Sequence, residues 1–308
     1  MRRFNAEINH WADWGRVFQS VSQFTPLIRQ IYQNENLPFT KLENLQPGTN
    51  AVFKVGYSVC KVFAPPESGL DSLADFHTEW FGLTRAHALG LPVPKVIARG
   101  RIRDRYDFMY LILELIEAKS YASLSRSLSD ADKTSIGWQL RQIADRMDTP
   151  CEPFNQWDPL VDGLENPCWQ QLPDSFNRER LAYLSHLQCK QRVYVHGDIN
   201  PDNVLLDQAL QVYLIDFADA ILAPPEYELA ALCDLFDYDA AAMSGYFGSD
   251  YRPEVITEHF FQAVLLHHFG ANIILNKLGT ADDFTSLNKL KNRIFEVLQE
   301  GKVHLNGS

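Results

Sequence analysis

The sequence predicts an α+β protein with two lobes, a small strand-rich lobe followed by a larger lobe that is mostly helical. Short apolar runs separated by turn residues cluster before residue 117, whereas apolar residues three and four positions apart dominate after it. The length of 308 residues also fits about two domains. We expect a helical extension over residues 1–36, a first lobe over 37–116, a second lobe over 117–308, and a cleft between the lobes.

The first lobe is predicted element by element. Apolar residues at helical spacing over 8–33, among them Trp14, predict one or two amphipathic helices interrupted near Pro26. A helix over 71–89, which Gly90 ends, is predicted by the same spacing. Strand-like runs, two of them joined by the Gly-containing hairpin 56–58, occupy residues 39–42, 51–55, 59–63, 93–98 and 108–115. The N-terminal helices are expected to pack either within the chain or in a dimer contact.

The second lobe begins after the polar stretch Glu117–Ser120. Its apolar spacing predicts helices over residues 130–148, 174–191, 226–243, 253–277 and 284–299. Two short apolar runs, 204–206 and 212–215, predict a pair of strands set into these helices.

Charge and cysteine content exclude several classes of protein. With 28 Lys and Arg against 39 Asp and Glu, the net charge of −11 argues against a nucleic-acid binder. No apolar run is long enough to span a membrane, and no apolar stretch typical of a signal peptide follows the N-terminus. Five widely spaced cysteines without a CxxC pair fit reduced thiols, so we expect a cytoplasmic protein.

The acidic excess lies in one segment. The 59 residues between Arg192 and Arg252 contain 11 acids and no Lys or Arg, while the rest of the chain is balanced. A solvated acidic face is the ordinary explanation. However, the same segment carries apolar runs typical of buried strands, and acids beside buried strands need partners such as a divalent metal or a cationic substrate.

The strongest motif lies in this acidic segment. His196, Gly197, Asp198 and Asn203 precede one predicted strand, and Asp216 follows the next. One amide and two carboxylate side chains offer the oxygen ligands that Mg²⁺ prefers beside substrate phosphates. The hairpin would bring Asp216 toward Asn203, so that both hold metal on ATP while Asp198 faces the attacking hydroxyl. A solvated turn before a hairpin is the alternative, because these residues are also common in turns.

These residues resemble the aminoglycoside phosphotransferase and choline kinase group, small-molecule relatives of protein kinases, whose signature is H-G-D-x-x-x-x-N followed by I-D-[FW]. The resemblance implies a two-lobed protein-kinase-like fold, with Asp198 as catalytic base and Asn203 and Asp216 as magnesium ligands. Gly197 stands where protein kinases have an Arg, and Ala218 replaces the Gly of Asp-Phe-Gly. These departures favour a small-molecule acceptor over a protein.

The resemblance also implies a nucleotide site in the first lobe. Lys61 on an apolar strand would hold the α- and β-phosphates and pair with Glu79 on the following helix, although an exposed strand position is the alternative for such a Lys. The backbone N–H groups of Gly48, Thr49 and Asn50 would approach the phosphates, or these residues form an ordinary turn. The Glu114 carbonyl and the Ile116 N–H would pair with adenine.

Three further acids, Glu226, Glu228 and Asp234, lie after the predicted strand 212–215. Glu228 matches a family position whose acid packs or caps beneath the catalytic loop, whereas Pro224 replaces the usual first Asp of that pattern. Glu226, Glu228 and Asp234 are expected either to cap buried backbone or to face substrate, and the sequence does not separate these roles.

Together these features predict an ATP- and Mg²⁺-dependent phosphotransferase that acts on a hydroxyl of a small molecule. Charge and resemblance favour a cationic acceptor, an aminoglycoside or another amine-bearing metabolite. A choline, homoserine or sugar kinase of the same fold stays open. So do a pseudokinase-type nucleotide-binding regulator, a protein kinase and a non-enzymatic scaffold. The sequence leaves the exact acceptor, ATP against GTP and the oligomeric state undecided.

Overall fold

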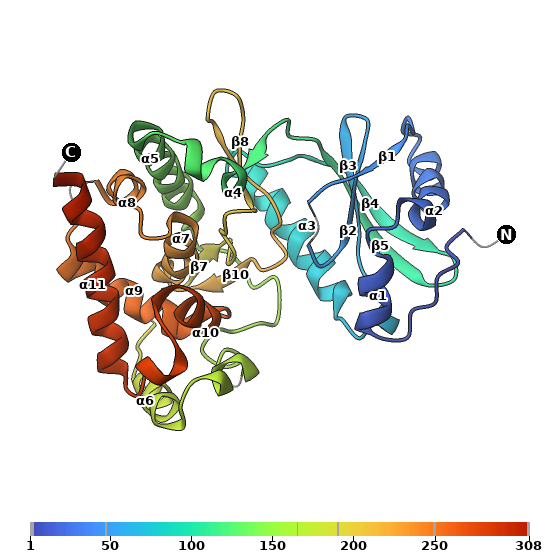
Figure 1. Cartoon of the computed structure of the whole chain (residues 1–308). Helices are drawn as coiled ribbons and strands as arrows, with labels where there is room; N and C mark the ends of the chain where they lie inside the picture. The colour runs from blue at the N-terminus through green and yellow to red at the C-terminus, as the bar shows by residue number, and fades with distance from the viewer. Residues whose placement is uncertain (1–2, 47, 165, 190, 249–250, 307–308) are drawn as a thin grey trace. The chain divides into compact units, whose positions relative to one another are not determined.

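The computed structural model describes residues 3–46, 48–164, 166–189, 191–248 and 251–306, with the backbone alone for 301–306. The chain divides into two compact units, Met1–Glu117 and Ala118–Ser308. The first contains a small antiparallel sheet and the second is mostly helical, which confirms the predicted α+β fold class (Figure 1). Among the described residues, no helix has the length and apolarity needed to cross a bilayer.

A five-stranded antiparallel sheet forms the centre of the first unit. Its strand order is β1-β2-β3-β5-β4, and the hairpin between β2 and β3 turns at Gly56, whose φ of +63° lies in the region that favours glycine. The strands span Leu42–Asn44 (β1), Ala51–Val55 (β2), Ser58–Val62 (β3), Val96–Arg103 (β4) and Asp107–Glu114 (β5).

The N-terminal helices share the core of the first unit. Helices α1 (Trp11–Val17) and α2 (Val21–Asn34) bury Trp14, Phe24 and Ile28 in one apolar cluster with Phe53 and Cys60 of the sheet. The helical break falls between α1 and α2, and α2 continues through Pro26, since its buried apolar face outweighs one lost backbone hydrogen bond. The helices therefore pack within the chain.

Helix α3 (Ser72–Ala88) packs beside β5. Successive strand residues point to opposite faces, so Cys60 and Val62 of β3 face the N-terminal cluster, while Lys61 points to the other face. Phe63, just after β3, contacts Phe76 of α3 with ring centroids 5.4 Å apart. Figure 1 shows α3 across the sheet from α2.

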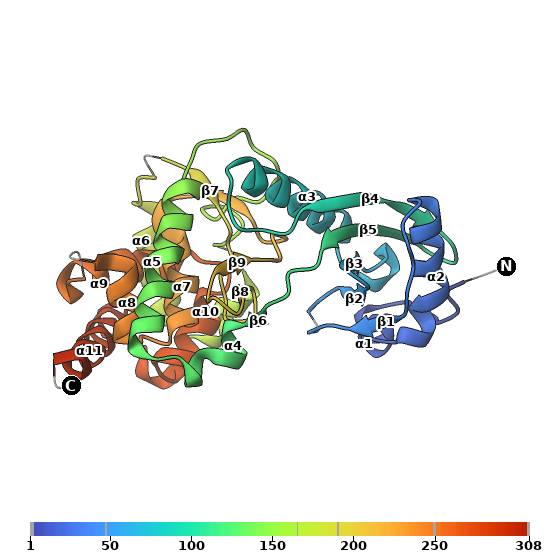
Figure 2. The ribbon, with the colours of Figure 1, turned by 90° about the horizontal axis from the view of Figure 1, so that it is seen from above.

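The second unit is built on helices with two small sheets between them. Figure 2 shows α5 running beside α8. The helices span Tyr121–Leu124 (α4), Asp130–Met147 (α5), Asp174–Ser185 (α6), Glu228–Phe236 (α7), Ala240–Phe247 (α8), Pro253–Leu266 (α9), Gly270–Ile273 (α10) and Leu287–Asn306 (α11), with a π-helical turn over Ile274–Leu278. Short 3₁₀ turns in the two units span Pro66–Ser68, Ser125–Ser127, Pro167–Gln171, Pro225–Tyr227 and Ala281–Asp283.

Two predicted long helices are broken in the structure. The expected helix 226–243 divides into α7 and α8 at Asp237 and Tyr238, whose φ angles are +50° and +58°. The expected helix 253–277 divides at His267, whose ψ of 141° ends α9. Apolar spacing continues across both breaks, so periodicity alone does not reveal them.

The two small sheets frame the predicted motif. Strands β6 (Lys119–Ser120), β8 (Val204–Leu206) and β9 (Val212–Leu214) form one antiparallel sheet. Strand β7 (Val193–Val195) pairs with β10 (Ile221–Ala223) in the other. The motif loop therefore leaves β7 and enters β8, and Asp216 lies on the segment between β9 and β10.

Candidate active site

The motif loop begins at a position where only glycine fits. Gly197 has a φ of +82°, and a Cβ atom on it would lie 2.1 Å from the backbone oxygen of Asp219. The loop thus passes in direct contact with the chain segment that follows Asp216. A side chain at residue 197, such as the Arg of protein kinases, would force these two segments apart.

His196 holds the loop from inside the unit. The Asp198 N–H donates to His196 Nδ1 at 3.2 Å, so the ring proton belongs on Nε2, which lies 3.0 Å from the Ile215 carbonyl oxygen. Burial lowers the pKa of His196 to about 4, so the ring is neutral at physiological pH. A neutral histidine therefore ties the residue before Asp216 to the loop that carries Asp198.

Asp198 is oriented by two asparagines. Asn200 Nδ2 and Asn203 Nδ2 donate to its Oδ2 at 2.8 and 3.0 Å. Both donors bind the same oxygen, so among the described residues Oδ1 is the oxygen left for a substrate hydroxyl. Burial, helped by the charges of Asp216 and Asp234, raises the pKa of Asp198 to about 6 against the hydrogen bonds from the asparagines. A carboxylate with such a pKa is suited to accept a proton near neutral pH.

Asn203 and Asp216 lie at the open ends of the β8–β9 hairpin. The Ile215 N–H donates to the Asn203 carbonyl oxygen at 3.1 Å, which places the residue before Asp216 beside Asn203. Because Asn203 Nδ2 is bound to Asp198, its side-chain oxygen points away from that carboxylate. Asp216 itself has a φ of +61°, a strained conformation for a non-glycine residue.

This donor set fits Mg²⁺. An amide oxygen and a carboxylate are hard ligands, and Mg²⁺ commonly takes one or two protein oxygens together with phosphates and water. In the described part of the chain, no three His, Cys, Asp or Glu residues gather in a way that would hold a metal by themselves. His259, His267 and His268, which lie close together in the sequence, accordingly form no such group there.

Glu228 lies beneath the loop rather than in front of it. Its Oε2 accepts the backbone N–H groups of His196 at 2.7 Å and Gly197 at 3.2 Å, and its side chain is buried. Burial raises the pKa of Glu228 to about 8, against these two hydrogen bonds. Of the two roles that the sequence left open for this acid, its contacts are those of a cap.

The other two acids are partly exposed. Glu226 lies 3.7 Å from His259 Nδ1, and Asp234 lies 3.7 Å from Lys277 Nζ. Burial raises the pKa of Asp234 despite the Lys277 charge. Both side chains are accessible in a way that Glu228 is not.

Sequence reasoning missed a buried layer behind the loop. The ring of His267 stacks on Tyr227 with centroids 4.4 Å apart, and the Tyr227 oxygen accepts the His268 N–H at 3.0 Å. Tyr227 directly precedes the cap Glu228. The only sequence signal was the unusual pair of histidines after an apolar helix, which pointed to no partner.

Lys61 and Glu79 meet in the first unit. Lys61 Nζ lies 2.6 Å from Glu79 Oε2, and both side chains are buried. A buried ammonium needs a nearby carboxylate, and this one comes from the middle of α3. The alternative of an exposed strand Lys does not match this position.

The turn at residues 48–50 precedes β2. Asn50 is buried and its Oδ1 accepts the Ala64 N–H at 3.2 Å, whereas Gly48 and Thr49 are exposed. At the other end of the sheet, Glu114 is the last residue of β5, and Ile116 lies two residues beyond it in the chain that leaves the unit. The turn 48–50 therefore lies just before β2, and residues 114–116 lie at and just beyond the end of β5.

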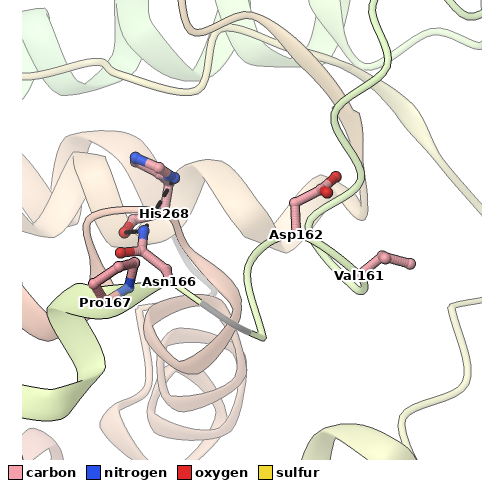
Figure 3. Close-up of a pocket in the computed structure, with 5 residues that line it drawn as sticks. All are labelled: Val161, Asp162, Asn166, Pro167 and His268. Atoms are coloured by element: carbon pink, nitrogen blue, oxygen red, sulfur yellow. Dashed lines mark hydrogen bonds between the residues drawn. The ribbon is translucent and has the colours of Figure 1, made fainter.

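The second unit also contains an open recess of about 360 Å³, lined by Val161, Asp162, Asn166, Pro167 and His268. Figure 3 shows the Asp162 carboxylate on one side and His268 with Asn166 on the other. Asn166 Nδ2 donates to the His268 carbonyl oxygen at 3.1 Å, which fixes the second side. The recess offers one acid, one amide and one imidazole to a polar molecule.

Comparison with known families supports the sequence resemblance. A family model described as "Phosphotransferase enzyme family" matches residues 45–256, which include Lys61, Asp198, Asn203 and Asp216. That range is more than half of the chain and excludes α1 and α2. Among curated proteins, none matches this chain.

Solved structures share the fold at low sequence identity. The GDP complex of wild-type aminoglycoside 2'-phosphotransferase-IIIa is 17% identical, with a TM-score of 0.60, over 94% of this chain and 98% of that chain. A thermostable mutant of aminoglycoside phosphotransferase APH(4)-Ia, in a ternary complex with ADP and hygromycin B, is 16% identical, with a TM-score of 0.55, over 89% and 98%.

Proposed function

The chain belongs to the phosphotransferase enzyme family, and from that premise we propose that it transfers the γ-phosphate of ATP to a hydroxyl of a small molecule. One observation carries the proposal. Asp198, with its pKa raised to about 6, is held through Oδ2 by Asn200 and Asn203, which leaves Oδ1 for an acceptor. An oriented carboxylate with this pKa supports the role of a general base.

Asp198 acts on the hydroxyl in this mechanism. Its Oδ1 accepts a hydrogen bond from the acceptor hydroxyl, aligns that oxygen with the γ-phosphorus and takes up the proton as the oxygen–phosphorus bond forms. The bond from the γ-phosphorus to the bridging oxygen breaks, and ADP leaves. Asn200 and Asn203 keep the carboxylate in this orientation, and Glu228 holds the loop from below.

The first unit supplies the nucleotide contacts. The Lys61 ammonium, held by Glu79, neutralises charge on the non-transferred phosphates. The N–H groups of the turn 48–50 approach the phosphate oxygens, and the Glu114 carbonyl and Ile116 N–H pair with adenine. The proposal therefore requires that Lys61 of one unit and Asp198 of the other act on the same nucleotide.

Asn203 and Asp216 would hold Mg²⁺ in this site. When bound, the ion would neutralise phosphate charge and fix the phosphate chain in line with the acceptor. The supporting observation is the set of ligand atoms: the Asn203 amide oxygen, which is turned away from Asp198, and the Asp216 carboxylate, which follows the second strand of the same hairpin.

We propose an amine-bearing acceptor, with an aminoglycoside as the first candidate. The run of 59 residues without Lys or Arg contains the Asp198 loop and 11 acids, and a segment with this negative charge attracts cations. Glu226, Asp234 and Asp162 are partly exposed acids of the same unit that would bind ammonium groups. The structural neighbour in complex with hygromycin B supports the same class.

A screen of ADP release tests the function. The purified protein is mixed with Mg²⁺, ATP or GTP, and panels of aminoglycosides, choline-like amines and neutral sugars. We expect acceptor-stimulated ADP release with at least one amine, no stimulation with Asp198→Asn, and normal stimulation with Asp202→Asn, which alters an exposed acid of the same loop. Stimulation by neutral sugars alone would reassign the acceptor class. Nucleotide binding without stimulated release would favour the pseudokinase alternative.

A further inference from the structure

The N-terminal helix α1 contacts the turn that we assign to phosphate binding. Trp14 is fully buried, and its indole Nε1 donates to the Thr49 carbonyl oxygen at 2.9 Å. Residues before 45 lie outside the family match, so this contact joins a segment outside the match to the first residues of the matched region.

The contact determines where one N–H group points. The peptide bond between Thr49 and Asn50 is trans, and in a planar trans peptide the carbonyl and the N–H point in opposite directions. Because the Thr49 carbonyl points to Trp14, the Asn50 N–H points away from α1. The Asn50 side chain is held by the Ala64 N–H and Ala51 is paired with Val62 in the sheet, so the indole is the contact that holds the Thr49 side of this peptide.

Trp14 itself is held rigidly. Its ring packs at 5.8 Å from Phe24 of α2, and Phe24 in turn packs at 5.3 Å from Phe53 of β2. Through Phe24, the Trp14 indole is therefore held in place relative to β2, the strand that follows the turn 48–50. Among the described residues, the N–H groups of Gly48, Thr49 and Asn50 donate to no protein acceptor, which suits them to an anionic ligand.

We propose that Trp14 is a positioning residue that aims the Asn50 N–H at the phosphates of the bound nucleotide. This inference rests on the proposed function. Trp14 touches no reacting atom in this account and acts only through the Thr49 peptide. The competing explanation is that Trp14 serves only as core packing, with its N–H satisfied by the nearest carbonyl.

The two explanations differ in which ligand they affect. A positioning role affects the phosphates, so Trp14→Phe should weaken Mg·ATP binding while leaving adenosine, which has no phosphate, bound as in the native protein. Loss of one net hydrogen bond predicts a roughly three- to tenfold higher Kd for ATP. The adenosine Kd should stay within about twofold, since the proposed adenine contacts lie on residues 114–116.

Calorimetric titration of native protein and variants with Mg·ATP and with adenosine gives these constants. Two controls are matched to the chain: Trp11→Phe alters the exposed tryptophan of the same helix, and Ile28→Val weakens packing of the same apolar cluster without touching the Trp14–Phe24 ring contact. We expect Trp11→Phe to behave as native and Ile28→Val to lower the Tm without changing the ratio of ATP to adenosine affinity.

A second measurement does not depend on nucleotide binding. Amide hydrogen exchange of Ala64, whose N–H donates to Asn50 Oδ1, should accelerate in nucleotide-free Trp14→Phe and stay unchanged in Trp11→Phe, because a loosened turn releases this hydrogen bond more often. If Trp14→Phe does not fold, replacing the Trp14 indole by its benzothiophene isostere removes the N–H and keeps the ring volume.

The outcomes separate the two proposals. Unchanged ATP binding and exchange in Trp14→Phe, or an equal loss of ATP and adenosine affinity, would overturn the positioning role while leaving the proposed function standing. A native protein that binds neither ATP nor GTP would overturn both.

Discussion

Replacing Gly197 by Ala tests the loop geometry on which the proposed mechanism depends. The new Cβ would lie 2.1 Å from the Asp219 backbone oxygen, where ordinary contact begins at 3.4 Å. One of the two chain segments must therefore move by more than 1 Å. Where the motif loop is the segment that moves, the N–H groups of His196 and Gly197 move with it, and both hydrogen bonds to Glu228 are broken or lengthened.

The expected cost follows from two separate effects. A residue with a Cβ at a φ of +82° costs about 1–2 kcal/mol, and forcing an extra methyl group into packed structure costs about 1–3 kcal/mol. We therefore expect Gly197→Ala to lower the free energy of unfolding by about 2–5 kcal/mol. A shift of about 1 Å next to Asp198 should reduce kcat about 100-fold.

Gly69→Ala provides the matched control. Gly69 has a φ of +84°, but nothing lies within 4 Å of the Cβ that Ala would add, so only the first cost applies. Urea unfolding and ADP release are measured for both variants. Equal losses of stability in the two variants, or full turnover in Gly197→Ala, would refute the assigned loop geometry.

Four further predictions concern charged groups of the site. Asp198→Asn should lower kcat by about 10²–10⁴-fold in the ADP-release assay, and unchanged turnover would exclude Asp198 as the base. Because the pKa of Asp198 in the ligand-free protein is raised to about 6, kcat/KM for the acceptor should fall as the pH drops through 6, and a kcat/KM profile flat down to pH 4.5 would contradict this. Glu79→Gln removes the carboxylate 2.6 Å from the Lys61 ammonium and should cost about 3–5 kcal/mol of stability in urea unfolding while raising the KM for ATP; a native-like Tm and KM would count against the pair. The pKa of Glu228 is about 8 in the folded protein and about 4.5 in the unfolded chain, so the folded state keeps a proton that the unfolded state has lost between these pH values. The free energy of unfolding of the native protein should therefore fall as the pH rises from 4.5 to 8, relative to that of Glu228→Gln. Parallel plots of unfolding free energy against pH for the two proteins would show that Glu228 is ionised throughout.

The sequence predicted the parts of the site that are local in the chain. Asp198 and Asn203 belong to one loop, and a hairpin visible in the apolar pattern brings the residue before Asp216 beside Asn203. Lys61 was identified as the lone charge of an apolar strand, and α3 carries its partner Glu79. The fold class followed from the same local patterns.

Partners far apart in the chain do not follow from local patterns. The family resemblance offered a cap as one of two roles for Glu228, and the cap itself depends on helix α7 starting beneath a loop 31 residues earlier. The bond from Trp14 to Thr49, which the sequence did not predict, depends on how α1 packs on the sheet. The break between α7 and α8 is set by the left-handed backbone of Asp237, a conformation that periodicity does not report. In each case tertiary packing, and not local preference, selects the contact.

A crystal structure with Mg²⁺ and the ATP analogue AMP-PNP tests the central claim most directly. The account predicts Lys61 Nζ on the α- or β-phosphate, with the Asn203 amide oxygen and the Asp216 carboxylate on a Mg²⁺ ion bound to the same phosphate chain. A nucleotide that contacts only one of the two units, or that binds away from these three side chains, would contradict it.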